Sequence, residues 1–316
     1  MPNLLRTRAS SINRALDQIG DKWCLLILQE IFWGVNTFND LLAASGMSRG
    51  VLSQRLQWLQ KIDCLKKVSQ AGKPKRPIYH LTRKSNELYP NALAALSWER
   101  AFFNTPLLDQ VSLVHKTCGK PFSPVLRCQQ CASQVYSMDV RYAQGPGHSQ
   151  DIREKKVRRR SSISIVDIPS NRLVYKNLIH IVGDRWTANI VALGFHGIKR
   201  FDEFHKELPV ATNILADRLR FLSEEEIFIP TRYQSRPDRF EYILSEKGLA
   251  LYPFFITLLQ WGDRWCGTGN GVPMIPQHLN CGFDLTANMC CDQCNQGLEA
   301  HDVILVERKE PLIKSN

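Results

Sequence analysis

The feature that most constrains this chain is an internal repeat with a constant offset of 163 residues. Gly-Asp-Lys-Trp at 20–23 returns as Gly-Asp-Arg-Trp at 183–186, and Leu-Tyr-Pro at 88–90 returns at 251–253. The offset holds without a gap. Each repeated unit exceeds a hundred residues, which is too long for a solenoid repeat and typical of a whole domain. The sequence therefore predicts two tandem copies of one domain.

Composition between the copies predicts a linker. Residues 141–162 are rich in Gly, Ser and Arg and offer little apolar surface to bury. We expect a first domain at 1–140, a basic linker at 141–170 and a second domain at 171–316. Residues 153–160 hold six basic side chains and one Glu. This run is interpreted either as a solvated tether or as an arm that contacts DNA phosphates or a minor groove.

The charge of the chain limits its partners. The formal net charge is +11 over 316 residues, which favours a polyanion, either nucleic acid or an anionic membrane surface. The N-terminus lacks the apolar core of a signal peptide, and no stretch approaches the ~20 apolar residues of a membrane span. We therefore expect no membrane partner. The ten cysteines then lie in a reducing compartment, where metal ligation or free thiols are expected in place of disulfides.

The first copy has the pattern of a helix-turn-helix. Apolar residues at 19, 23, 26 and 27 have the spacing of one amphipathic helix, and 38–44 predicts a short second helix. A turn at Gly46 leads to a recognition helix at about 48–60, whose leucines at 52, 56 and 59 face the core. The candidate DNA-contacting side chains of this helix are Ser48, Arg49, Ser53, Gln54 and Gln57.

A basic hairpin follows the recognition helix. Two short strands flank a Gly/Pro/basic loop, which predicts a wing at about 66–82. Lys73, Lys75 and Arg76 suit contact with phosphates or a minor groove, because neutralising phosphates releases counterions. A solvated hairpin with charges for solubility is the alternative, but its position after a helix-turn-helix, in duplicate, favours DNA contact.

The second copy repeats this plan. Its recognition helix is expected at about 211–223, with Leu215, Leu219 and Leu222 inward, and its wing at about 229–245. The candidate contacts are Thr212, Asn213 and Arg220 on the helix and Arg232, Arg236 and Arg239 on the wing. Arg55 and its counterpart Arg218 lie beside the core leucines, where a phosphate contact and an internal salt bridge are equally open.

Each copy ends in a cysteine-rich tail with the pattern H-x2-C-x9-C-x2-C. Three thiolates and one imidazole suffice for tetrahedral Zn²⁺, so we expect a structural zinc knuckle in each copy, with reduced thiols in a small hairpin as the alternative. Cys290 is one residue out of register and is not expected to be a ligand. The expected ligands are His115, Cys118, Cys128 and Cys131 in the first copy and His278, Cys281, Cys291 and Cys294 in the second.

Several motifs together resemble the HxlR-type winged helix-turn-helix regulators. They include Ile-Gly-Asp-Lys-Trp at 19–23, Leu-Ser-Gln-Arg-Leu at 52–56, Tyr-His-Leu-Thr at 79–82 and Arg-Pro-Asp-Arg-Phe-Glu-Tyr at 236–242. The resemblance implies an α+β, mainly helical fold and a bacterial cytoplasmic transcription factor that binds double-stranded DNA. Members dimerise through helices flanking the winged helix. Two modules in one chain therefore suggest an intramolecular pseudo-dimer or a homodimer.

Three classes of function compete. The leading prediction is a DNA-binding regulator without enzymatic activity. An alternative is a protein-interaction or assembly module in which only the first copy binds DNA, because net charge is +9 over residues 1–140, +4 over 141–170 and −2 over 171–316. A thiol or zinc enzyme is the third class. Neither tail has the H-x-E and P-C-x-x-C pair of a zinc deaminase or another acid/base partner, so the sequence does not favour it.

Overall fold

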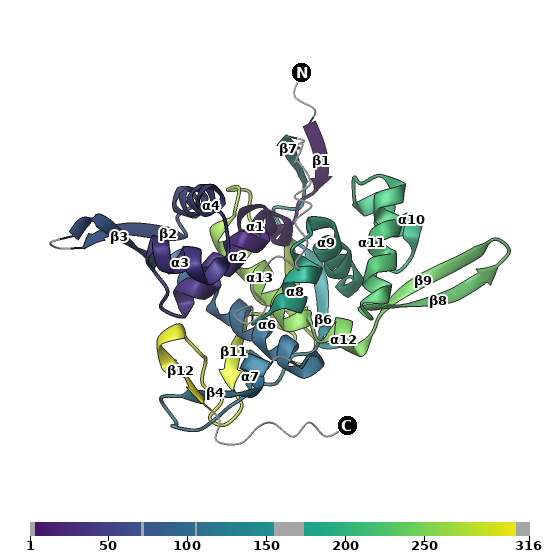
Figure 1. Ribbon diagram of the computed structural model, residues 1–316. Helices are drawn as coiled ribbons and strands as arrows, with labels where there is room; N and C mark the ends of the chain where they lie inside the picture. Colours follow the sequence, from purple (N-terminus) through teal and green to yellow (C-terminus); the bar gives the residue numbers. More distant parts are fainter. Residues whose placement is uncertain (1–3, 71–72, 105, 155–173, 308–316) are drawn as a thin grey trace. The chain divides into compact units, whose positions relative to one another are not determined.

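The computed structural model describes residues 4–70, 73–104, 106–154 and 174–307 (Figure 1). These residues form two compact units. The first-copy unit contains 17–125 together with 174–180 and 288–307, and the second-copy unit contains 181–287 together with 4–16 and 126–154. Each unit thus combines the winged helix of one copy with the two ends of the other copy. Among the described residues no helix is long and apolar enough to cross a lipid bilayer.

In the winged helix of the first copy, capping residues set the ends of the helices and leucines form their buried face. Thr37 and Ser48 accept backbone N–H bonds at the starts of α3 and α4, and Gly46 ends α3 in the left-handed conformation. Leu52, Leu56 and Leu59 are buried on α4. The elements are α2 (Lys22–Phe32), α3 (Phe38–Ser45), α4 (Arg49–Lys61), β2 (Leu65–Gln70), β3 (Lys73–Leu81), α5 (Arg83–Asn86), α6 (Tyr89–Phe102) and α7 (Pro106–Asp109).

The single amphipathic helix expected across residues 19–27 is wrong. The structure has two helices there, because α1 (Ser11–Ile19) ends before Gly20 and α2 begins at Lys22. Asp21 has an extended backbone and its carboxylate accepts the N–H of Trp23, which caps α2. The apolar spacing survives the break because both helices bury that face.

The second copy has the same architecture. Its leucines at 215, 219 and 222 are buried on α11, as expected. The family of folds predicted from the sequence, a winged helix-turn-helix with mixed helices and strands present twice, is confirmed. The elements are α8 (Lys176–Val182), α9 (Arg185–Phe195), α10 (Phe201–Glu207), α11 (Thr212–Glu224), β8 (Phe228–Ser235), β9 (Asp238–Leu244), α12 (Glu246–Leu249) and α13 (Tyr252–Trp265).

The cysteine-rich tails are exchanged between the copies. In the first-copy unit, β4 (Val111–His115) pairs antiparallel with β12 (Val303–Glu307). In the second-copy unit, β10 (Met274–His278) pairs in the equivalent register with β6 (Val140–Gln144). Two further strands, β5 (Pro124–Cys128) and β11 (Ala287–Cys291), carry the first cysteine of each C-x2-C pair.

The exchanged strands also correct the predicted linker. Residues 141–170 were expected to connect the domains, but 140–144 form β6, and β7 (Gln150–Glu154) pairs with β1 (Leu4–Arg8). The composition of this segment does not predict β6, because this strand gains its hydrogen bonds from β10 of the other copy, which a local pattern does not reveal. Residues 155–170, including most of the basic run, lie outside the described residues.

The first helices of the two copies are exchanged as well. In the second-copy unit, the Ser11 hydroxyl donates to Asp263 on α13, and the backbone carbonyl of Ser11 lies where a Cβ on Gly262 would be. In the first-copy unit the position equivalent to Gly262 is Glu99 on α6, whose carboxylate accepts the N–H groups of Asn177 and Leu178 on α8. Both units therefore hold the exchanged helix by hydrogen bonds to a carboxylate, and only the second-copy unit adds a close backbone approach at a glycine.

Candidate nucleic-acid interface and metal centres

The recognition helix α4 has a polar face opposite its buried leucines. Arg49, Gln54 and Gln57 are exposed, and Ser53 is half-buried. The Arg49 guanidinium lies over the Phe38 ring of α3, 5.9 Å from the ring centre. Ser48 is exposed, but its hydroxyl accepts the N–H of Val51 and so has a capping role. Arginine and amide side chains on an exposed helix face are those that make paired hydrogen bonds to base edges.

The wing of the first copy is the hairpin β2–β3, with a bulge between Val68 and Gln70. Lys66 and Lys67 on β2 are exposed. The backbone of β3 begins at Lys73, so the three predicted wing contacts Lys73, Lys75 and Arg76 lie on this strand, but their side chains lie outside the described residues.

The equivalent face of the second copy carries acids among its arginines. Thr212 and Asn213 are exposed at the start of α11, which has no side-chain cap. Arg220 forms an ion pair with Asp217 at 2.8 Å, and Glu224 lies 3.9 Å from it. On the hairpin β8–β9, Arg232 lies 3.5 Å from Asp238, while Arg236 and Arg239 are exposed. Two of the predicted DNA contacts, Arg220 and Arg232, are thus each already paired with a carboxylate.

The alternatives for Arg55 and Arg218 resolve in favour of an internal salt bridge. Arg55 donates two hydrogen bonds to Asp21, at 2.9 and 3.1 Å. Arg218 contacts Asp184 at 2.7 Å. In each copy this ion pair joins the recognition helix to an N-capping carboxylate, that of α2 in the first copy and that of α9 in the second.

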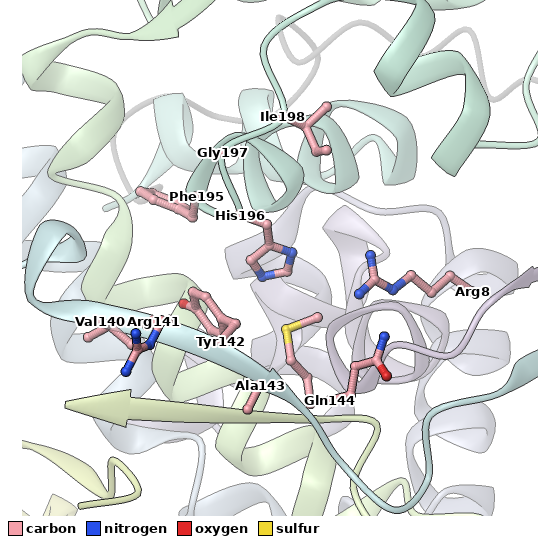
Figure 2. A pocket seen from close by; sticks show the side chains of 11 residues that line it. Arg8, Val140, Arg141, Tyr142, Ala143, Gln144, Phe195, His196, Gly197 and Ile198 are labelled. Atoms are coloured by element: carbon pink, nitrogen blue, oxygen red, sulfur yellow. The ribbon is translucent and has the colours of Figure 1, made fainter. Parts of the chain in front are cut away.

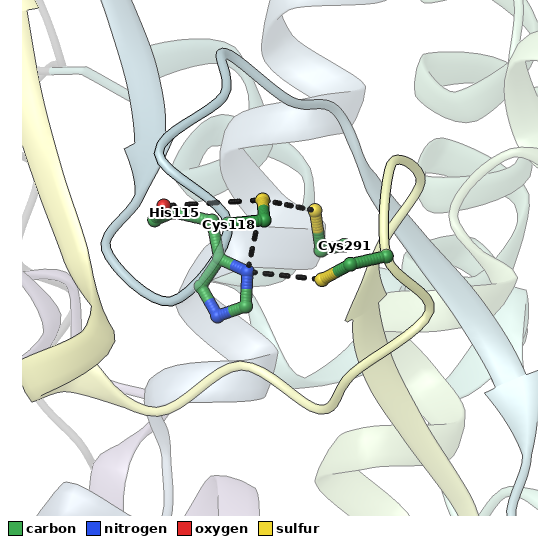
Figure 3. Close-up of side chains that lie close together, drawn as sticks. His115, Cys118 and Cys291 are labelled. Atoms are coloured by element: carbon green, nitrogen blue, oxygen red, sulfur yellow. Dashed lines mark hydrogen bonds between the residues drawn. The ribbon is translucent and has the colours of Figure 1, made fainter.

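The eight predicted metal ligands come together, but not in the predicted grouping. Within the first-copy unit, His115 and Cys118 meet Cys291 and Cys294 of the second copy (Figure 3). The second-copy unit contains the reciprocal set, Cys128, Cys131, His278 and Cys281. The expectation that each tail closes on its own metal is therefore wrong. The H-x2-C pair and the C-x2-C pair of each tail lie in different units, so each pair meets its complement from the other copy.

The spacing of the donor atoms fits a tetrahedral metal. In the first set, the Cys118 sulfur lies 3.6 Å from His115 Nδ1 and 3.9 Å from the Cys291 sulfur. In the second set, His278 Nδ1 lies 3.2 Å from Cys281 and 3.5 Å from Cys131. A tetrahedron with Zn–S of about 2.3 Å and Zn–N of about 2.0 Å places its ligand atoms about 3.5–3.8 Å apart.

Four equivalent turns present these ligands. The residue that follows the second ligand of each pair has a positive φ, between 60° and 75°. Its N–H donates to the carbonyl of the first ligand, for example Gly119 to His115 at 2.7 Å and Asn295 to Cys291 at 2.8 Å. Two of the four positions are glycines, which favour this conformation. The other two are Ala132 and Asn295.

Local contacts tune the thiols in opposite directions. A hydrogen bond with the Ser133 side chain, 3.1 Å from the sulfur, and further bonds lower the pKa of Cys131 to about 6. Burial raises the pKa of Cys291 to about 11. Both imidazoles are buried. A divalent cation would offset the cost of burying thiolates at either site, because metal-bound cysteines are deprotonated.

Comparison with known proteins identifies the module. The sequence profile of the HxlR-like helix-turn-helix family matches residues 18–106 and 181–270, which together exceed half of the chain. The chain belongs to this family. Both matches end before the cysteine-rich tails. The resemblance stated from the sequence is therefore confirmed, and so is the presence of the module in two copies.

Individual relatives cover one copy each. An uncharacterized HTH-type transcriptional regulator of Mycobacterium bovis is 32% identical over 142 residues, 45% of this chain and 90% of the relative. The HTH-type transcriptional regulator YodB of Bacillus subtilis is 33% identical over 93 residues, 29% of this chain and 83% of YodB. The solved reduced form of YodB is 31% identical over 30% of this chain and 94% of its own, with a TM-score of 0.27. Both relatives are named as transcriptional regulators.

Proposed function

We propose that this HxlR-like protein is a sequence-specific DNA-binding transcriptional regulator in which α4 and the first wing supply most of the affinity. The observation that carries the proposal is the exposed face of α4, where Arg49, Gln54 and Gln57 stand opposite buried leucines. Such a face suits a major groove, and the lysines of the adjacent wing suit phosphates. In the second copy, Arg220 and Arg232 face carboxylates that oppose phosphate contact.

Selection of bound sequences from random duplexes with the full chain tests this function. A preferred sequence should emerge, with two unlike half-sites, since α4 and α11 differ in sequence. Arg49→Ala should change the preferred bases at a cost of about 1–3 kcal/mol. Lys75→Ala is the matched control and should weaken all sequences alike. Enrichment of no sequence, or a uniform loss with Arg49→Ala, would contradict this assignment.

A second candidate function is that the second copy serves in assembly. Its wing exposes apolar side chains, namely Ile229, Tyr233, Phe240 and Ile243. An apolar wing is unusual for contact with phosphates and suits a protein surface. If Thr212→Ala and Asn213→Ala leave the selected sequence unchanged, the second copy acts in assembly and not as a reader of bases.

We also propose that two structural Zn²⁺ ions hold the exchanged tails and so stabilise an intramolecular pseudo-dimer. Support comes from the two reciprocal ligand sets, each with one imidazole and three thiols at tetrahedral spacing. The residues that would hold one ion are His115, Cys118, Cys291 and Cys294, and those for the other are Cys128, Cys131, His278 and Cys281. Among the described residues, each set consists of one imidazole and three thiols and includes no carboxylate that could act as a general base. This composition favours a structural role.

Two double substitutions distinguish exchanged sites from self-contained ones. Purified full-length protein should hold about two zinc ions per chain. Cys118→Ser with Cys294→Ser removes two ligands of one exchanged site and should leave about one ion. Cys118→Ser with Cys131→Ser removes one ligand from each site and should lower occupancy of both. The reverse ranking by elemental analysis would show that each tail closes on itself.

A further inference from the structure

A pocket of about 430 Å³ lies in the second-copy unit, at the point where exchanged segments meet the winged helix. The exchanged strand β6 forms one wall, and the loop between α9 and α10, at 195–198, forms another. Arg8 comes from β1 and Met274 from β10. This volume is in the range of sites that bind small molecules. The proposal that follows does not depend on DNA binding.

His196 lines this pocket and has one polar atom without a partner. Its Nδ1 is buried without a hydrogen-bond partner in the structure. Burial, with a contribution from the nearby Arg8 charge, lowers the pKa of His196 to about 4, so the imidazole is neutral at physiological pH. A buried polar atom without a partner costs free energy that a ligand can recover.

Charge and ring surfaces in the pocket define a ligand class. Figure 2 shows the Arg8 guanidinium and the His196 ring pointing toward one another, with Gln144 beside them, while Arg141 points away. The Tyr142 ring meets His196 edge-on at 4.5 Å, and its hydroxyl is engaged with Tyr252. Phe195 packs against Tyr252 and Phe255. The pocket therefore offers one guanidinium and one neutral imidazole at the end of an aromatic wall.

The equivalent positions of the first copy lack this chemistry. The 163-residue offset replaces His196 by Trp33, Tyr142 by Leu305 and Gln144 by Glu307. Trp33 and Leu305 are 37% and 47% exposed. An acid replaces an amide and an indole replaces an imidazole, so an anion would be disfavoured there. Among the described residues, the first-copy unit therefore does not repeat the polar side chains of this pocket.

We propose that this pocket binds a small aromatic monocarboxylate. Arg8 binds the carboxylate, the neutral His196 imidazole, with its proton on Nδ1, donates a hydrogen bond to it, and the aromatic ring of the ligand packs along Tyr142 and Phe195. Arg8 already lies 3.3 Å from Glu207, so the ligand competes with a half-exposed ion pair. Exposed ion pairs contribute little, and a planar carboxylate can accept two hydrogen bonds from one guanidinium.

Calorimetric titration of the full-length protein with benzoate tests the proposal, with benzyl alcohol as the neutral probe. Benzoate should bind, benzyl alcohol should bind at least about tenfold more weakly, and Arg8→Gln should cost benzoate about tenfold. Glu207→Gln frees Arg8 and should strengthen benzoate binding, which guards against a loss caused by misfolding. Arg232→Gln removes a cation from the same unit outside the pocket and should have no effect.

Three outcomes would overturn the proposal. The first is no benzoate binding to the wild-type chain up to about 10 mM, where even weak specific sites are occupied. The second is equal binding of benzoate and benzyl alcohol, which would show that the carboxylate is not recognised. The third is an equal loss with Arg8→Gln and Arg232→Gln, which would reflect net charge alone.

Discussion

The two recognition helices share a core and differ on the surface. α4 and α11 bury three leucines each at equivalent positions, and an arginine on each forms an ion pair with the carboxylate that caps α2 or α9. Their exposed faces have diverged, because Gln54 is replaced by Asp217 and Arg49 by Thr212. The core of the recognition helix is thus the same in both copies, whereas the charge of its exposed face differs.

The divergence extends to the surfaces that receive the exchanged helices. Glu99 on α6 accepts hydrogen bonds from α8, whereas the equivalent Gly262 on α13 allows Ser11 to approach closely. A duplicated domain in one chain is free to specialise in this way, since neither copy must match itself. In a homodimer the same residue serves both subunits.

The largest expected effect tests the shared part of the comparison. Leu56→Ala and Leu219→Ala each leave a cavity beneath a recognition helix and should each cost about 2–5 kcal/mol of unfolding free energy. Because both side chains are fully buried, the two losses should be similar in denaturant titration of the full chain. A cost confined to one variant would mean that the cores are not equivalent.

The two copies should also differ in how pH changes their stability. Burial raises the pKa of Asp263 to about 6, from its usual 3.8, although Ser11 and Arg14 oppose the shift. A raised folded pKa favours the protonated acid, so this contribution to stability is present below about pH 4 and is lost as pH rises through about 6. The equivalent residue of the first copy is Arg100, so this carboxyl has no counterpart there.

Asp263→Asn provides the measurement. It should remove the loss of stability between pH 4 and pH 7, leaving the variant more stable than wild type at pH 7 by about 1–3 kcal/mol. Asn retains an acceptor for the Ser11 hydroxyl, so packing is preserved. Parallel stability-versus-pH curves for the two proteins would contradict the assignment of this shift to Asp263.

A smaller effect should come from exchanging surface residues between the recognition helices. Asp217→Gln removes the acid that pairs with Arg220 and gives α11 the residue found in α4. DNA affinity should rise about two- to fivefold, because phosphate repulsion falls and Arg220 is released. Gln54→Asp is the reciprocal change and should weaken binding by more, if α4 makes the closer contact. Effects of equal size on DNA affinity would contradict the proposal that α4 makes the closer contact.

Much of the fold follows from the sequence because its signals are local. Leucine spacing, the Ser48 cap and the turn at Gly46 place α4 within one residue of the predicted range. The spacing also predicts the eight candidate metal ligands, and the structure gathers all of them in two groups. The spacing does not predict their grouping, because an H-x2-C pair can complete a metal site with the C-x2-C pair of its own tail or with that of the other copy.

The two remaining errors have different origins. The strand at 140–144 depends on a segment far away in sequence, whereas the break after Ile19 follows from the local Asp21 cap of α2. The pocket around His196 is also invisible to local patterns, since a lone histidine after an apolar helix carries no signal. The repeat offset aligns residues 140–144 with the apolar residues 303–307, and this alignment could have extended the first domain past residue 140.

The salt dependence of DNA binding by two triple variants tests the central claim most directly. One variant replaces Lys73, Lys75 and Arg76 of the first wing by Gln, and the other replaces Arg232, Arg236 and Arg239 of the second. The logarithm of affinity falls with that of salt by about 0.9 for each phosphate contact. The account predicts a slope reduced by about 2–3 in the first variant and by less than about 1 in the second. An equal or greater reduction in the second variant would contradict it.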